Sequence, residues 1–414
     1  MKRTIFVGSS SFPGSATGIS QSVYAQILAL HQAGYEILCF CPSTKKEGPI
    51  NQLKAIATVH CHGPSSDPRT ELFLMIKEYN KVRPKLIINN DNPYVSNLMV
   101  YADCPKISFC HMNKSNIYKL VVNDSSVCDV VGAISHFMMG DLKKKIASKE
   151  KVSLFPNIFV PPFDALNCEH KESIVGEPGK VKLVYAGGSN LNKGISYIKS
   201  LLAKLNDSSL KESVEVHLFG QYNDKDRSFI AQLSSLSIVF HGFVSSFDFY
   251  KALIASDILL FPSLNEGLPM TIIEAMSAKM AVLSIDGVGG VSDLVLNGFN
   301  GLCVDEGDWI ELSLAYIGMV INAPSKLNRL KENSFLIFDS NFSSGNFVRN
   351  LENVFSLTMR HSTESKMNID CISFPRGKVR LLSWHRIPRG SENYNFLVGL
   401  RQRLGMLASR VYGL

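Results

Sequence analysis

The sequence predicts an α/β fold made of two doubly wound, Rossmann-like domains that face a cleft, followed by a basic C-terminal extension. Through the first half of the chain, short apolar runs that suit buried strands alternate with helical stretches, which indicates parallel sheets covered on both faces. After a polar stretch the same alternation begins again. With 414 residues, the chain is also too long for one ordinary core, so two or three domains are expected from length, and the repeated alternation favours two of similar size.

Seven apolar runs of the first half have the length and composition of buried strands. The stretch between the first two, residues 19–34, has a helical pattern and ends at Gly34, a residue type that commonly stops a helix. The runs are residues 4–8, 36–41, 57–62, 86–90, 106–111, 130–135 and 152–157. We therefore predict that residues 1–166 form the first Rossmann-like domain.

A polar stretch, "NCEHKESIVGEPGK" at residues 167–180, has the glycine and proline content of a linker. Strand-like runs then resume at residues 181–188, 213–221, 237–243, 257–263 and 281–286. We predict a second domain over residues 181–340, a closing helix over 341–365 and a basic tail over 366–414. In doubly wound sheets, ligands bind at the carboxyl ends of the strands, so the functional residues are sought there.

The overall composition excludes several classes of protein. Hydrophobic residues make up 45% of the chain and charged residues 19%, which is typical of a globular protein. No apolar run reaches the roughly 18–20 residues of a membrane span, and the apolar start is too short for a signal peptide. The nine cysteines lie mostly in strand-like runs, as free cytosolic thiols do, and no zinc-like spacing predicts a metal site.

The net charge of +7 is concentrated in the tail. Residues 371–414 hold eight basic side chains and one acidic side chain, so the remainder of the chain is neutral and no nucleic-acid partner is expected. Apolar residues of the tail recur at helical spacing between arginines, which suits a helix on anionic lipid or a helix docked on the body. The lysine-rich segment at residues 135–151, with Phe137, Met138, Leu142 and Ile146, suggests a membrane surface more weakly.

The segment "PSLNEGLPMTIIEAMSA", residues 262–278, places two glutamates eight positions apart. Glu266 falls in a loop after a buried strand, and Glu274 falls inside the helix expected over residues 271–278. The unpaired backbone N–H groups at a helix start favour an anion such as phosphate. On the spacing alone, a simpler interpretation stays open, in which Glu274 complements the helix dipole and Glu266 caps the loop.

The surrounding residues resemble the signature of glycosyltransferase family 4, the retaining enzymes with the GT-B fold. The matching positions are Pro262, Ser263, Glu266, Gly267, Pro269, Glu274, Ala275 and Met276. The resemblance covers roughly residues 1–360 and is stronger in the second half. It implies that Glu266 lies beside the donor sugar and that Glu274 binds the nucleotide ribose. It also implies that the backbone of Gly267, Leu268, Pro269, Met270 and Thr271 cradles the diphosphate.

Three further segments resemble the same family. In "YAGGSNLNKG", Lys193 matches the lysine that neutralises the donor diphosphate, but Gly188 stands where the family has an arginine. Gly18 opens the helix after a glycine-containing loop, where backbone can approach a ligand closely. His111 ends a strand at the place of a histidine near the donor sugar. Outside the resemblance, Lys193 would be a surface lysine and His111 a structural histidine.

The resemblance implies a hexosyltransferase-type enzyme that moves a sugar from a nucleotide diphosphate sugar to a glycan or lipid-linked acceptor, in cell-surface polysaccharide synthesis. We expect no cofactor and no metal, and we interpret "DKD" at residues 224–226 as a solvated loop. The expected location is cytoplasmic, with an option of peripheral attachment to the inner face of the membrane. A sugar epimerase, a phosphorylase and a non-catalytic nucleotide-sugar-binding scaffold are the alternatives; the missing arginine motivates the scaffold.

Overall fold

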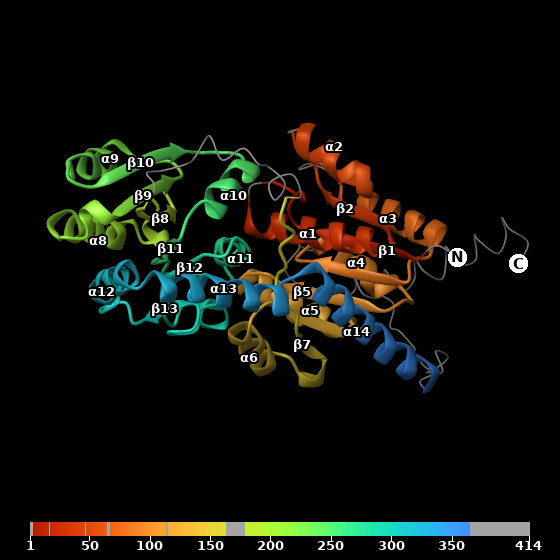
Figure 1. Ribbon diagram of the computed structural model, residues 1–414. Coiled ribbons are helices and arrows are strands. Elements are labelled where there is room, and N and C mark those ends of the chain that lie inside the picture. The colour runs from red at the N-terminus through yellow and green to blue at the C-terminus, as the bar shows by residue number, and fades with distance from the viewer. Residues whose placement is uncertain are drawn as a thin grey trace, which may run out of the picture. The chain divides into compact units, whose positions relative to one another are not determined.

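The structure is a computed structural model that describes residues 3–15, 17–45, 47–63, 67–112, 115–162 and 179–364. Its contacts divide the chain into two compact units, each built on one parallel sheet (Figure 1). The predicted fold class of two Rossmann-like α/β domains is thereby confirmed. Most of the expected linker and the whole basic tail at 366–414 lie outside the described residues.

Unit 1 contains a seven-stranded parallel sheet, sheet A, in the order β3-β2-β1-β4-β5-β6-β7. Its strands are β1 (Thr4–Ser9), β2 (Glu36–Pro42), β3 (Thr58–His62), β4 (Leu86–Asn90), β5 (Lys106–Cys110), β6 (Val130–Ala133) and β7 (Val152–Leu154). Its helices are α1 (Gly18–Gln32), α2 (Glu47–Ile56), α3 (Pro68–Val82), α4 (Pro93–Tyr101), α5 (Ser115–Asp124), α6 (His136–Lys145, from Met138 on) and α14 (Ser344–Glu364, from Phe347 on).

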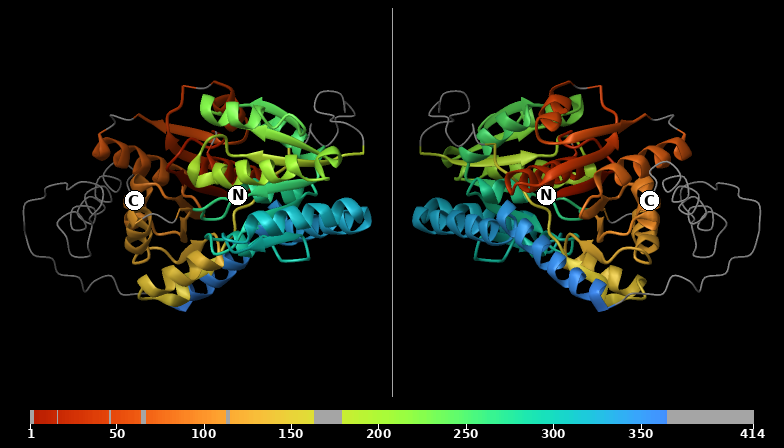
Figure 2. Two further views of the ribbon diagram at one scale, coloured as in Figure 1. Left: turned by 90° about the vertical axis from the view of Figure 1, so that its left-hand side faces the viewer. Right: turned by 90° about the vertical axis from the view of Figure 1, so that its right-hand side faces the viewer.

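Unit 2 contains a six-stranded parallel sheet, sheet B, in the order β10-β9-β8-β11-β12-β13. Its strands are β8 (Val181–Ala186), β9 (Val214–Phe219), β10 (Ser237–Gly242), β11 (Ile258–Phe261), β12 (Ala281–Ile285) and β13 (Gly301–Val304). Its helices are α8 (Ile195–Asp207), α9 (Asp224–Ala231), α10 (Ser246–Ile254), α11 (Met270–Ser277), α12 (Trp309–Asn322) and α13 (Pro324–Asn341). Figure 2 shows the layers of each unit from two further sides.

The central strands form because their residues are apolar at consecutive positions and can be buried on both faces of a sheet. Every residue of β4, β11 and β12 is buried, whereas the edge strand β10 is only partly buried. Strand order reverses between β1 and β4 in sheet A, and between β8 and β11 in sheet B. Ligands of doubly wound sheets bind at the carboxyl edge near such a reversal.

The last described helix, α14, returns the chain to unit 1. Phe347, Leu351 and Val354 on this helix are buried. The hydroxyl of Tyr35 in unit 1 lies 3.5 Å from a carboxylate oxygen of Glu352. Unit 1 is therefore completed by residues from both ends of the described chain.

The lysine-rich segment at residues 135–151 does not present the apolar stripe that its membrane interpretation needs. Met138, Leu142 and Ile146 are buried, because the apolar side of α6 and the residue after it pack inward, and only Phe137 of the four is exposed. Among the described residues, no helix is long and apolar enough to cross a membrane. The described cysteines are free thiols, and most are buried, but Cys61 is exposed.

Candidate functional site

Two loops at the carboxyl edge of sheet B bring Lys193 and Glu266 into contact. Lys193 ends a short 3-10 helix, η2 (Leu191–Lys193), that follows β8, and Glu266 lies in the loop that follows β11. Because β8 and β11 are neighbours in a parallel sheet, both loops emerge at the same edge. Lys193 Nζ lies 2.6 Å from Glu266 Oε1. The lysine remains partly open to solvent, with 37% of its side chain exposed, against 11% for Glu266.

Ser263 connects these two loops, and the sequence analysis did not assign it a separate role. Its Oγ lies 2.6 Å from Glu266 Oε1 and 3.1 Å from the carbonyl oxygen of Asn192. The backbone N–H of Leu264 donates to the same carbonyl at 2.8 Å. One oxygen of Glu266 is thus held by an ammonium and a hydroxyl. The described residues make no hydrogen bond to the other oxygen, Oε2, which leaves it for a ligand.

Local packing explains why Gly188 replaces the arginine of the family pattern. Gly188 has φ +53°, in the left-handed region that favours glycine. A Cβ atom at this position would lie 2.3 Å from the carbonyl oxygen of Gln221, in the loop after β9. The same carbonyl accepts a hydrogen bond from the N–H of Ser189 at 2.9 Å, so it is fixed in place. An arginine would fit here only after both loops moved.

The segment Gly267–Thr271 leads into helix α11 at this same edge. The carbonyl of Gly267 accepts a hydrogen bond from the N–H of Gly290 at 2.7 Å, and Leu268 and Met270 are buried. The helix begins at Met270, one residue before the predicted start. Pro269 precedes it and provides no side-chain cap. The N–H groups of the first turn are therefore not occupied by a capping side chain and can bind an anion.

Glu274 lies one turn further along α11. Burial raises the pKa of its carboxyl group from the ordinary 4.5 to about 7. None of the described residues makes a hydrogen bond to this carboxyl group. Near neutral pH both protonation states are therefore populated, and a ligand hydroxyl that donates to Glu274 would favour the carboxylate.

Gly18 is the first residue of α1 in unit 1, as predicted, but the start of this helix is already capped. Thr17 Oγ1 accepts a hydrogen bond from the N–H of Ser20 at 3.3 Å, and Ser20 Oγ accepts one from the N–H of Thr17 at 3.1 Å. This reciprocal capping box uses donors that an anion would otherwise bind. The ligand role of Gly18 stays a prediction.

His111 follows β5 at the carboxyl edge of sheet A and is buried, with 4% of its surface exposed. Its ring stacks on Phe109 with 5.8 Å between the ring centroids. Its backbone N–H donates to Asp91 Oδ2 at 3.3 Å. These contacts hold both the backbone and the ring of the histidine.

Asn90, at the end of β4, determines which nitrogen of His111 carries a proton. The amide Nδ2 of Asn90 donates to the carbonyl of Gly8 at 3.2 Å, so Oδ1 is the end that faces His111. His111 Nε2 lies 2.7 Å from this oxygen, which can only accept. Nε2 must therefore carry the proton, and in the neutral ring Nδ1 is the acceptor.

Two buried carboxyl groups lie in the same part of unit 1. Burial raises the pKa of Asp91 to about 8, and Asp91 Oδ1 has no hydrogen-bond partner among the described residues. Burial also raises the pKa of Asp124 to about 6, although Ser108 donates to it at 2.7 Å. In the sequence, "NN" at residues 89–90 marks only the end of a predicted strand. The polar run "NNDN" directly after apolar residues was the signal for this cluster.

The segment "DKD" at residues 224–226 is not the solvated loop that was predicted. It forms the first turn of α9, capped by the Asn223 side chain. Asp226 is buried, and its Oδ1 lies 2.6 Å from Lys199 Nζ. Burial acts to raise the pKa of Asp226, but hydrogen bonds led by that from Lys199 hold it below its ordinary value. Within the described ranges, no three potential ligand residues are grouped so as to hold a metal ion.

The structure thus brings Lys193, Glu266 and Ser263 into direct contact and places Gly188 in the loop that carries Lys193. Glu274 lies on the helix that follows Glu266. His111 and Gly18 belong to unit 1 and are described only within it.

Residues 169–336 match the family described as Glycosyl transferases group 1. This segment contains all the site residues named in unit 2. The two-sheet architecture matches solved glycosyltransferases of the GT-B class over most of the chain. Residues 169–336 are therefore similar to a group 1 glycosyltransferase domain, and the chain has the two Rossmann-like domains of the GT-B fold.

A relative in Bacillus subtilis (strain 168), named as a teichuronic acid biosynthesis glycosyltransferase, TuaC, is 29% identical over 211 residues. The match covers 49% of this chain and 49% of TuaC, so it spans about half the length of that curated relative. Anabaena HepE, solved in complex with UDP-glucose, aligns with 86% of this chain and 99% of its own at a TM-score of 0.64 and 17% identity. A glycosyltransferase from Rickettsia africae aligns with 87% and 99%, at a TM-score of 0.64 and 14% identity.

Proposed function

We propose that this protein transfers a sugar from a nucleotide diphosphate sugar to a glycan or lipid-linked acceptor, with retention of the anomeric configuration. The contact between Lys193 and Glu266 carries the proposal. This contact pairs a cation of the kind that binds a diphosphate with a carboxylate whose second oxygen is still available to a ligand. Both groups lie at the sheet edge where ligands bind. The group 1 domain over residues 169–336 supports the same conclusion.

In this proposal, Lys193 exchanges its contact with Glu266 for the diphosphate of the donor. The exchange suits a lysine that is partly open to solvent, because its ammonium can move without breaking a buried packing contact. The N–H groups at the start of α11 bind the same diphosphate. The negative charge that grows on the leaving phosphate is then stabilised by groups already in place.

Glu266 and Glu274 bind the sugar and the ribose of the donor. Glu266, kept in place by Ser263 after Lys193 leaves, binds the donor sugar through its available oxygen. Glu274 accepts hydrogen bonds from the ribose hydroxyls. The bond between the anomeric carbon and the β-phosphate oxygen breaks, and the acceptor oxygen forms its bond on the same face. The acceptor proton passes to the departing phosphate oxygen, so no strong base is required.

We propose a uridine diphosphate sugar as the donor and a cell-surface polysaccharide precursor as the acceptor. The donor class is supported by the structural likeness to HepE, which was solved with UDP and with UDP-glucose. The acceptor class is supported by the name of TuaC and by a lipopolysaccharide outer core galactosyltransferase, WaaB, among the structural neighbours. We further propose that the protein needs no cofactor and acts at the cytoplasmic face of a membrane.

A non-catalytic scaffold that binds nucleotide sugars is the second candidate function. Gly188 favours it, because the loop conformation excludes the arginine that the family pattern places there. Such a protein would bind a nucleotide sugar and never consume it. The two candidates therefore differ in turnover and not in binding.

The test begins with a thermal-shift screen of the full chain against UDP, GDP, ADP, dTDP and CMP and their sugar conjugates. A ligand present at 100 times its dissociation constant adds about 2.7 kcal/mol of stability. The stabilising donor is then incubated with the protein and extracted lipid-linked glycans, with and without EDTA, and NMR reads the new anomeric linkage. Turnover that Glu266→Gln abolishes, with nucleotide binding retained, supports the enzyme. Binding without turnover supports the scaffold, and an inverted linkage excludes the retaining mechanism.

A further inference from the structure

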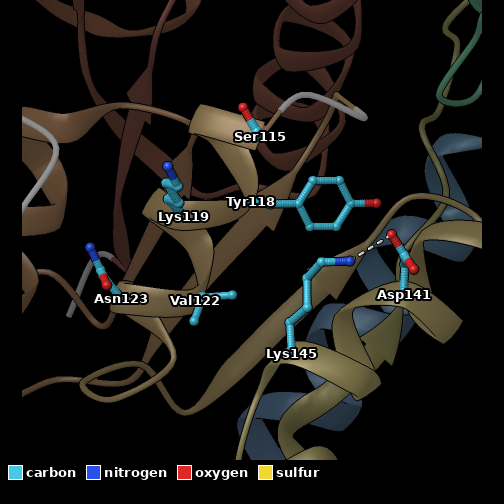
Figure 3. Close-up of a pocket in the computed structure, with 7 residues that line it drawn as sticks. All are labelled: Ser115, Tyr118, Lys119, Val122, Asn123, Asp141 and Lys145. Carbon is cyan, nitrogen blue, oxygen red and sulfur yellow. Dashed lines mark hydrogen bonds and ion pairs between the residues drawn. The ribbon is translucent and has the colours of Figure 1, made fainter.

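Unit 1 has a groove between α5 and α6, away from the residues that the proposed reaction uses (Figure 3). Its volume is about 540 Å³, within the roughly 300–1,000 Å³ of small-molecule sites. Ser115, Tyr118, Lys119 and Asn123 line it from α5, and Asp141 and Lys145 line it from α6. The Tyr118 ring projects from α5 toward Lys145 and Asp141 in Figure 3.

The groove carries an excess of positive charge. Asp141 is its one lining carboxylate, and it already contacts Lys145 at 2.8 Å and Lys144 at 3.9 Å. Lys145 also lies 4.8 Å from the centre of the Tyr118 ring, so its position is fixed by two contacts. Lys119 is exposed and has no ion-pair partner in the part of the chain that the structure describes. A negatively charged group of a ligand could bind Lys119 without displacing another carboxylate.

Several hydrogen-bonding groups of the groove also lack partners. Tyr118 is buried, with 5% of its surface exposed, and its hydroxyl makes no hydrogen bond to the described residues. The side chains of Ser115 and Asn123 make none either, as far as the chain is described. The Tyr118 hydroxyl is closed off from solvent, whereas Ser115 and Asn123 are exposed and are the uncharged polar groups that a ligand in the groove would meet.

We propose that this groove binds an acidic saccharide, as a segment of the acceptor glycan away from its reacting hydroxyl. The acceptor role rests on the proposed function. A sugar carboxylate would bind Lys119, while neutral sugar hydroxyls would bind Asp141, Asn123 and Ser115. The single carboxylate of Asp141 suits a ligand that mixes hydroxyls with one charge per residue, because hydroxyls can donate to it.

A lipid surface fits this groove less well than a saccharide does. The site is concave, Met138 and Leu142 of α6 are buried, and Phe137, the exposed apolar residue of α6, does not line the groove. A membrane-binding face would need exposed apolar groups beside the lysines.

The test measures binding of trigalacturonate to the full chain by isothermal titration calorimetry at low salt, with neutral maltotriose as the comparison ligand. Lys119→Glu should weaken trigalacturonate binding by roughly threefold to tenfold and leave maltotriose unchanged. Lys119→Arg should retain the affinity. The matched control is Lys77→Glu, which makes the same charge change at an exposed position of α3. Equal loss in Lys119→Glu and Lys77→Glu would overturn the proposal, since only net charge would then matter.

Two further readouts separate this proposal from the proposed function. A thermal shift with UDP reports on unit 2, so UDP binding without trigalacturonate binding would overturn the groove proposal alone. Failure of UDP to bind would instead count against the proposed function. Sedimentation with vesicles of phosphatidylglycerol tests the lipid alternative. If the protein binds these vesicles, and Lys119→Glu abolishes that binding while Lys77→Glu does not, the ligand of the groove is a lipid headgroup and not a saccharide.

Discussion

The carboxyl edges of the two sheets hold different kinds of polar groups. In unit 2, Lys193 and Glu266 contact each other at 2.6 Å near a helix start that no side chain caps. In unit 1, the corresponding edge holds His111 and Asn90 in a buried hydrogen bond, and the start of α1 is capped by Thr17. One edge is thus prepared to bind a charged ligand. The other holds a buried, hydrogen-bonded histidine and asparagine close to Asp91, whose pKa is raised by burial to about 8.

The largest effect is expected from Lys193→Ala in unit 2. Removal of a group that stabilises charge in the transition state costs roughly 100-fold to 1,000-fold in turnover. Steady-state kinetics with the donor found in the screen measures kcat. Lys204→Ala, an exposed lysine that contacts Glu311, is the matched control and should retain activity. Unchanged kcat in Lys193→Ala would remove the functional contrast between the two edges.

Gly188→Arg should destabilise unit 2 instead of restoring a family arginine. The added Cβ atom would lie 2.3 Å from the Gln221 carbonyl oxygen. In addition, the positive φ of Gly188 is strained for any residue that has a Cβ atom. We expect a loss of about 2–3 kcal/mol in the free energy of unfolding, measured by urea denaturation. Gly298→Ala separates the two causes, because Gly298 also has a positive φ but no atom near its Cβ position. A more active, equally stable Gly188→Arg protein would contradict the packing explanation.

Glu274→Gln should stabilise the ligand-free protein in a pH-dependent way. The folded-state pKa of about 7 lies above the ordinary 4.5, so the folded protein binds this proton more tightly than the unfolded chain. The stability that comes from this proton is present below pH 4.5 and is lost as the pH rises through 7. Glutamine carries no ionisable proton, so the variant should gain about 3 kcal/mol over the native protein at pH 8 and little at pH 4.5.

Thermal melts at both pH values measure this difference, and the same melts with UDP should show weaker stabilisation of the Glu274→Gln variant. A stability difference that does not change with pH would show that Glu274 is not the desolvated acid described above.

The smallest effect is expected from Asn90→Ala in unit 1. Without the Asn90 oxygen, His111 loses the acceptor that fixes its Nε2–H form, at a cost of about 1 kcal/mol in the free energy of unfolding. Long-range ¹H–¹⁵N correlation NMR should show the Nε2–H form in the native protein and a mixture in the variant. Asn92→Ala is the control, because Asn92 also binds the β1 end through Ser9 but does not contact the ring. Equal NMR changes in both variants would contradict the role of Asn90.

The sequence allowed the fold class and the Glu266 loop to be predicted, because both depend on local patterns. Consecutive apolar residues mark strands such as β11, and the motif from Pro262 to Met276 is continuous in the chain. The contacts that were missed join distant segments. Ser263 binds the carbonyl of Asn192, 71 positions away, and Asp226 binds Lys199 across 27 positions. Such contacts depend on which strands are neighbours, and no local pattern gives the strand order.

The return of α14 to unit 1 has a consequence for biosynthesis. Tyr35 and Glu352 are 317 positions apart, and the helix that carries Glu352 also contributes buried side chains. A ribosome adds about 5–20 residues each second, so sheet A waits roughly 15 seconds to a minute for this helix after Tyr35 is made. Unit 2, apart from Ser135–Phe137, spans residues 156–346, so it is synthesised before most of α14 and can finish first. The nascent chain is therefore expected to complete its later unit before its earlier one.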